Sequence, residues 1–217
     1  NWINSLYVYN KFRRIGKSIL FVANTLYEAN IFFQAIRNYT SDVVFFPMDD
    51  FITSEVLASS PELKVTRLET LNELISSNKI VVTNLMGFLR FLPSIDSYKN
   101  HFIQLKVNRD YKISKLINDL SNIGYSRETI ISKTGEMAVR GFIIDVFPLG
   151  SVKPIRIEFW GDTIESIREF DIDSQMTTNR INKVSISPNT EFLIDSELDR
   201  NIEQIPHREL IKYMPEK

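Results

Sequence analysis

Ser18-Ile-Leu-Phe-Val-Ala23 is a compact apolar run, typical of a strand that is buried in a parallel sheet. The next residues predict the start of a helix, because Thr25 can act as an N-cap and Glu28 stands at the spacing of a capping box. The stretch 26–39 then places apolar residues at helical spacing. A strand followed directly by an amphipathic helix indicates the first half of a βαβ unit.

The same alternation continues along the first hundred residues. Two further strands and two further helices are predicted over 42–46, 79–83, 67–75 and 85–92. Strands that alternate with helices at this interval favour a mainly parallel sheet with helices on both faces. We therefore predict an α/β domain over 1–100, to which the chain returns at 188–217.

The pattern changes near His101. The next segments read as a half-exposed strand, a helix that stops at Gly124, and two hairpin-like runs, over 102–107, 114–123, 135–147 and 155–170. A strand, a helix and several strands in succession predict a small α+β domain. We place this domain at 101–187 and expect it to be inserted into the α/β domain.

Composition restricts the classes of function. The chain has 217 residues, of which 43% are hydrophobic and 24% charged, as in an ordinary folded protein. It contains no cysteine, which excludes disulfides and thiolate metal sites and fits a cytoplasmic protein. A formal net charge of −1 gives no support for strong nucleic-acid binding, and no apolar run approaches the roughly 20 residues of a membrane span.

The most informative motif is Arg140-Gly-Phe-Ile-Ile-Asp-Val-Phe-Pro148, followed by Ile155-Arg-Ile-Glu-Phe-Trp-Gly-Asp162. In the second stretch apolar and polar residues alternate, so Arg156 and Trp160 are expected to share one face of a strand. Two exposed residues of these types either anchor a binding partner, or the Arg forms a cross-strand salt bridge that the aromatic ring covers. We interpret Gly141 as a strand bulge or a tight packing site.

These stretches, continued by Ile164–Asp171 and Ser174-Gln175, resemble the second domain shared by UvrB and the bacterial transcription-repair coupling factors (Mfd). The first domain supports the resemblance, in the order Phe45–Asp50, Arg67–Leu71 and Ile80–Asn84. Together these blocks cover roughly residues 17–190. The chain departs from the family where Phe142 replaces a small residue and Trp160 replaces a common Phe.

The resemblance implies the amino-terminal, UvrB-like part of a coupling factor. Its first domain would be a degenerate P-loop-NTPase-like domain without a Walker A loop, and its inserted domain would bind UvrA. The family positions implicated in that contact correspond here to Arg140, Arg156 and Trp160, whereas Asp145 and Phe159 are expected to be structural. The expected role is to recruit UvrA to RNA polymerase stalled at DNA damage.

No phosphate-binding loop is predicted in this chain. Gly16-Lys17-Ser18 precedes a strand, whereas a Walker Lys opens a helix after one. We therefore expect no catalytic residue, cofactor or metal site, with ATP and Mg²⁺ bound by motor domains elsewhere in the parent protein. Those absent domains would also contact DNA and RNA polymerase, and could pack on this chain to mask it. The alternative is a UvrB-type or helicase-type ATPase fragment whose P-loop lies outside the chain.

Overall fold

The computed structural model describes residues 2–50 and 60–193. Its contacts divide the chain into two compact units, Asn1–Leu92 and Pro93–Lys217. The sequence predicted this division after residue 100. The helix α5 (Ile95–Asn100) falls instead in the second unit, where Tyr98 is buried and its ring meets the ring of Phe102 edge-on.

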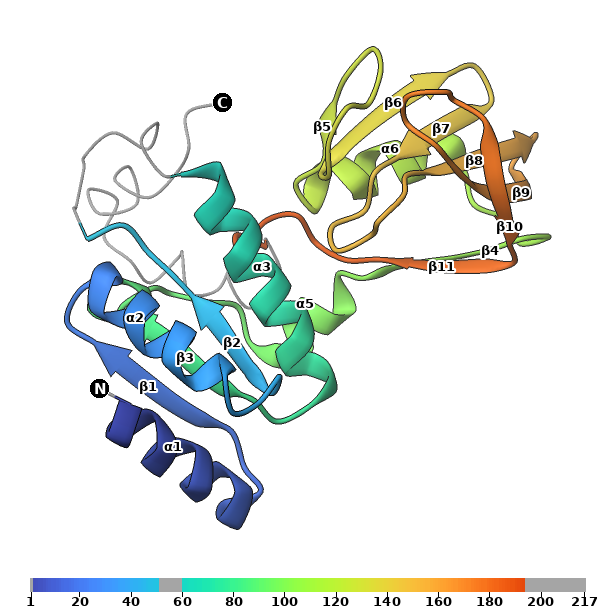
Figure 1. Ribbon diagram of the computed structural model, residues 1–217. Helices are drawn as coiled ribbons and strands as arrows, with labels where there is room; N and C mark the ends of the chain where they lie inside the picture. Colours follow the sequence, from blue (N-terminus) through green and yellow to red (C-terminus); the bar gives the residue numbers. More distant parts are fainter. Residues whose placement is uncertain (1, 51–59, 194–217) are drawn as a thin grey trace. The chain divides into compact units, whose positions relative to one another are not determined.

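The first unit contains a parallel sheet of three strands, β1 (Ile19–Ala23), β2 (Val43–Phe46) and β3 (Ile80–Asn84). Their order is β1-β3-β2, so the central strand comes last in the chain (Figure 1). The three predicted strands and their parallel pairing are confirmed. The relation of this sheet to P-loop NTPases stays a prediction.

Among the described residues of this unit, four helices accompany the sheet: α1 (Trp2–Ile15), α2 (Leu26–Arg37), α3 (Pro61–Ser76) and α4 (Leu85–Phe88). The predicted cap of α2 is confirmed, since the Thr25 hydroxyl accepts from the N–H of Glu28 at 3.2 Å. The Asp50 carboxylate accepts from the N–H of Leu26 at 2.8 and 2.9 Å and so satisfies another free donor of the same helix end. Asp50 is therefore a cap, as a loop carboxylate often is.

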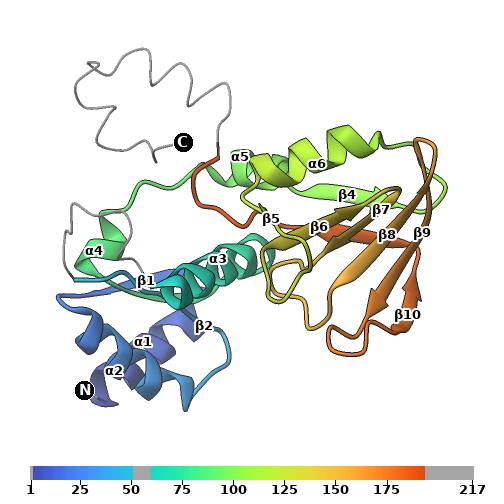
Figure 2. The same cartoon turned by 90° about the horizontal axis from the view of Figure 1, so that it is seen from above.

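The second unit is built around a six-stranded sheet of order β10-β9-β8-β7-β6-β5 (Figure 2). Its strands are β5 (Ser126–Arg127), β6 (Glu136–Arg140), β7 (Ile143–Val146), β8 (Ile155–Trp160), β9 (Thr163–Phe170) and β10 (Thr177–Ile181). A separate antiparallel pair joins β4 (Ile103–Lys106) to β11 (Lys183–Ile186). This is the small α+β domain that the sequence predicted.

The core of the second unit follows from period-two alternation. In β8, Ile155, Ile157 and Phe159 are buried and the residues between them are not. The helix α6 (Ile113–Asn122) lies along the sheet in both views and buries Leu116 and Leu120 completely. One face of the sheet is therefore covered, and the other face carries the charged residues Asp145, Arg156, Glu158 and Arg168.

The segment after β11 packs on the end of α6. The N–H of Asn189 donates to the carbonyl of Ile123 at 2.7 Å, and its side-chain amide donates to the carbonyl of Gly124 at 3.0 Å. Residues 188–193 thus remain with the second unit, where the sequence predicted a return to the first domain. The rest of that predicted return, 194–217, lies outside the described residues, and the insertion stays a prediction.

No helix in the described ranges, 2–50 and 60–193, is both long and apolar enough to cross a membrane.

Replacement of Gly124 by alanine is predicted to cost more stability than the same replacement at Gly150, which also has a positive φ. The φ of Gly124 is +91°, and an added Cβ would stand 2.8 Å from the Cβ of Thr190. Gly150 has φ +74° but open space around it. Gly150→Ala should cost about 1–2 kcal/mol from backbone strain alone, and Gly124→Ala at least about 1 kcal/mol more, because the 189–190 segment must move.

Urea denaturation of both variants beside the wild type measures this difference. Equal costs for the two substitutions would show that the 189–190 segment does not pack on Gly124 in solution.

Candidate functional site

The charged face of the six-stranded sheet brings together the residues that the motif singled out. The ladder places Asp145 of β7 opposite Arg156 of β8, and directly opposed residues point to the same face. Arg140 ends β6, the strand on the other side of β7. One carboxylate therefore lies between two guanidinium groups from the two flanking strands.

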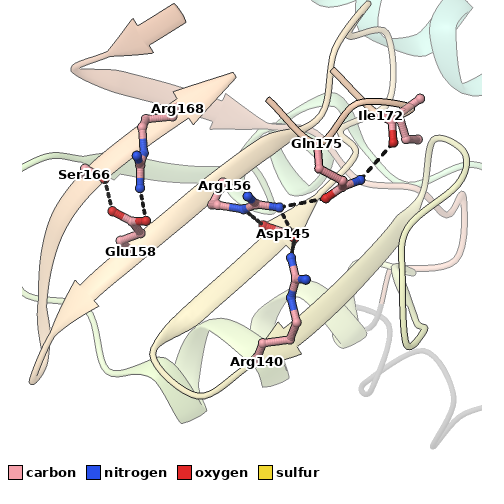
Figure 3. A network of polar contacts seen from close by, with 8 residues as sticks. All are labelled: Arg140, Asp145, Arg156, Glu158, Ser166, Arg168, Ile172 and Gln175. Carbon is pink, nitrogen blue, oxygen red and sulfur yellow. Dashed lines mark hydrogen bonds and ion pairs between the residues drawn. The ribbon is translucent and has the colours of Figure 1, made fainter. Parts of the chain in front are cut away.

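Asp145 binds both arginines, as Figure 3 shows. Arg156 donates from Nε to Oδ1 at 2.7 Å and from Nη2 to Oδ2 at 3.0 Å, a bidentate pair. Arg140 donates from Nη2 to Oδ2 of the same carboxylate. The Asp145 side chain is only 3% exposed, so its charge is compensated almost entirely by these two partners.

Arg156 is largely covered, although its strand position predicted exposure. Its side chain is 17% exposed, its guanidinium lies 4.4 Å from the ring centroid of Phe170, and its Nη2 also donates to Oε1 of Gln175 at 3.0 Å. The hydrogen bonds to Asp145 raise the pKa of Arg156, against the effect of burial. Arg156 thus mainly makes contacts within the face, and little of its side chain is exposed to a partner.

Arg140 and Trp160 are the exposed members of the predicted set. The side chain of Arg140 is 50% exposed and Trp160 is 79% exposed. Both lie at the same end of the sheet, because the N–H of Phe159 donates to the carbonyl of Phe142, in the turn that follows Arg140. Within the described residues, the Arg140 side chain makes no hydrogen bond or ion pair apart from those with Asp145, so its Nη1 and Nε remain available as donors.

The turns at this end of the sheet correct the interpretation of Gly141. It is neither a bulge nor a packing site, since a Cβ added there would meet nothing within 4 Å. Its φ of +59°, with Phe142 in an ordinary conformation, is the pattern of a two-residue II′ hairpin turn. Gly161 has the same role after Trp160, with φ +61°. These tight turns hold Arg140 and Trp160 at fixed strand ends.

Sequence reasoning missed a second ion pair on this face. Arg168 of β9 donates to Glu158 of β8, whose other carboxylate oxygen accepts from the Ser166 hydroxyl at 2.8 Å (Figure 3). The alternation within β8 and β9 placed these residues on an outer face. It could not pair them, because pairing depends on how the two strands align.

Glu136 is a third carboxylate of the sheet, but it does not join the arginines. Burial alone would raise its pKa. The N–H groups of Ser132 and Lys133 and the Ser132 hydroxyl bind its Oε2, and together they hold the pKa below its usual value. Glu136 therefore fixes the loop before β6 and is a structural residue.

The charged face exposes side chains of types that proteins use in binding. Within the described part of the chain, no group of three or more His, Asp or Glu side chains could hold a metal ion. The available groups are a half-exposed guanidinium and an exposed indole, which are common anchors of protein–protein interfaces.

Comparison with known proteins places this face in a family. Residues 103–192 match the family model described as the UvrB interaction domain. The chain is also 35% identical over 196 residues to the transcription-repair-coupling factor of Staphylococcus epidermidis and 33% identical over 196 residues to that of Staphylococcus haemolyticus. Each alignment covers 89% of this chain. The chain belongs to the transcription-repair coupling factor family.

This result confirms the family resemblance found in the sequence motifs. The chain spans 17% of the length of these coupling factors, about a sixth. The matched region of the UvrB interaction domain contains the whole charged face, from Arg140 to Gln175.

The stability of the second unit is predicted to depend on Asp145 far more than on Arg140. Asp145→Ala leaves two guanidinium groups without their shared partner and should cost about 3 kcal/mol. Arg140→Ala removes a half-exposed partner while the pair with Arg156 remains, so its cost should be below about 1 kcal/mol. Arg156→Ala should fall between these values, because it also uncovers the ring of Phe170.

Chemical denaturation of the three variants tests this order. A cost for Arg140→Ala as large as that for Asp145→Ala would contradict this order and show that the exposed pair of Arg140 and Asp145 is structural.

Proposed function

We propose that the second unit is a docking domain through which a transcription-repair coupling factor recruits UvrA to RNA polymerase stalled at DNA damage. The observation that supports this proposal is the charged face, where Arg140 and Trp160 stand exposed at one end of a rigid sheet. The family model that matches this region is described as the UvrB interaction domain. The choice of UvrA as the partner is our inference.

Arg140 and Trp160 make the direct contacts in this proposal. The N–H groups on Nε and Nη1 of Arg140 can donate charge-assisted hydrogen bonds to partner carboxylates, and the indole of Trp160 can exclude water beside them. Arg156 contributes chiefly by holding Asp145, which in turn orients Arg140. The third predicted contact residue is therefore mainly a positioning residue.

We further propose that this chain has no catalytic activity. The fragment Gly16-Lys17-Ser18 connects a helix to a strand, since Gly16 follows the end of α1 with φ +66° and its N–H donates to the carbonyl of Phe12. The Ser18 hydroxyl bonds to Asn78 at 3.2 Å and does not open a helix. This order is the reverse of a Walker loop, in which the glycines and the Lys lead from a strand into a helix.

The remaining activities of the parent protein belong to other parts of it in this proposal. ATP and Mg²⁺ would be bound by its motor domains, which would also engage DNA and RNA polymerase. The same motor domains could cover the charged face when the protein is idle and release it on a stalled polymerase. One surface can serve both states when the two partners compete for it.

UvrA binding should depend on the two exposed residues. Arg140→Ala and Trp160→Ala should each weaken the binding of UvrA by about 30-fold, the usual consequence of truncating an interface anchor. Both variants should melt close to the wild type, because neither side chain is buried. Calorimetry or surface plasmon resonance with purified UvrA measures the affinity.

Two exposed residues of the same unit provide matched controls. Val152→Ala removes a side chain that is 92% exposed, and Lys133→Ala removes a cation whose side chain is 79% exposed. Neither should change the affinity. If Arg140→Ala unfolds the domain while its folded fraction binds UvrA normally, Arg140 is an internal ion-pair residue and the interface lies elsewhere.

The absence of a nucleotide site is tested separately. Titration of the 217-residue chain with Mg²⁺ and ATP should give no binding heat at micromolar concentrations and no phosphate release. Micromolar binding that disappears in Lys17→Ala would instead favour the alternative of a UvrB-type or helicase-type ATPase.

A further inference from the structure

The sheet of the second unit carries a row of three arginines that extends past the residues discussed so far. The register pairs Arg156 of β8 with Arg168 of β9, and Arg168 with Arg180 of β10. Directly opposed residues of antiparallel strands share a face, with Cβ atoms about 5 Å apart. The three guanidinium groups therefore follow one another across three strands, on the face that holds Asp145.

The position of Arg180 in this row results from an irregularity in β10. The ladder pairs Thr177 with Phe170 but Asn179 with Glu169, so one residue of β10 is inserted between these two pairs. Such a bulge reverses the faces of the residues that follow it. In a regular ladder continued from the pair of Thr177 and Phe170, Asn179 would stand opposite Arg168 in place of Arg180.

The positive charges of the row are compensated unequally. Arg156 is paired with Asp145, and Arg168 is paired with Glu158. Arg180 is exposed, and within the described ranges its side chain makes no hydrogen bond or ion pair with another residue. Like charges directly opposite each other destabilise a sheet, so the outer end of the row is a place where an added anion would be stabilising.

We propose that Arg180 is a further contact residue for the partner, and that the docking surface runs from Trp160 and Arg140 across the arginine row to the edge strand β10. This inference rests on the proposed docking function. The partner surface that fits it is a protein surface with carboxylate groups, at least one of which faces Arg180.

The charges of the row favour a carboxylate surface over a nucleic acid. Asp145 and Glu158 lie among the arginines, and each would repel a phosphate backbone that followed the row. The chain as a whole has a net charge of −1. Single guanidinium forks spaced between fixed carboxylates suit separate Asp or Glu side chains, which they bind through two parallel hydrogen bonds.

The test compares two charge reversals of equal size in the 217-residue chain. Arg180→Glu changes the end of the row. Arg127→Glu is the control, because Arg127 is an exposed arginine on β5, at the opposite edge of the same sheet, where it is paired with the buried Met137. Affinity for purified UvrA is measured for both variants at about 50 and 300 mM salt, and thermal melts show that both are folded.

Arg180→Glu should weaken UvrA binding by at least about fivefold at low salt, and the loss should shrink at high salt, as for a charge at the rim of an interface. Arg127→Glu should bind like the wild type. Equal affinities for the two variants would overturn the assignment of Arg180 and leave the docking function intact.

Two other results are distinguishable from that one. A wild-type chain that does not bind UvrA would refute the docking function itself. Duplex DNA binding by the wild type that Arg180→Glu abolishes and Arg127→Glu preserves would show that the row binds phosphates, and would overturn the assignment to a carboxylate surface.

Discussion

The charged face depends on one buried carboxylate that is shared by two arginines. Asp145 stands on the middle of three neighbouring strands and takes a guanidinium from each flanking strand, Arg140 from β6 and Arg156 from β8. An isolated buried charge is costly, and this cost makes the paired arrangement strongly preferred over any in which either arginine turns away. The carboxylate thereby sets the position of the guanidinium that remains partly exposed.

This arrangement separates the residues that hold the face from those that can bind a partner. Arg156 is covered by Phe170 and Gln175, whereas Arg140 and Trp160 project at the strand ends beside tight glycine turns. A binding group that is already ordered loses little conformational entropy on association, so more of its interaction energy appears as affinity. Glu158 orders Arg168 in the same way. Arg180 has no such side-chain partner among the described residues, so it is the least constrained cation of the row.

Local patterns in the sequence predicted most of the elements. Apolar runs and helical spacing located the strands of the first unit, and the capping box located the start of α2, because each of these signals depends only on residues close together in the chain. The start of α3 was placed too late. The helix begins at Pro61, and a proline in the first turn is itself a signal of a helix start that could have been used. Gly141 was misread because a turn glycine and a bulge glycine look alike without the adjoining register.

The sequence by itself determined the family, the alternation of the strands and the motif that contains Arg140, Arg156 and Trp160. Only the tertiary structure decided that Arg156 is covered, that Asp145 serves two arginines and that Arg180 completes a row with Arg168. Alternation is a local property that assigns a residue to a face of its own strand. Which residues meet across strands depends on register, and a single inserted residue in β10 reverses the faces of all that follow. That information arises when distant segments pair, so the arginine row exists only in the folded sheet.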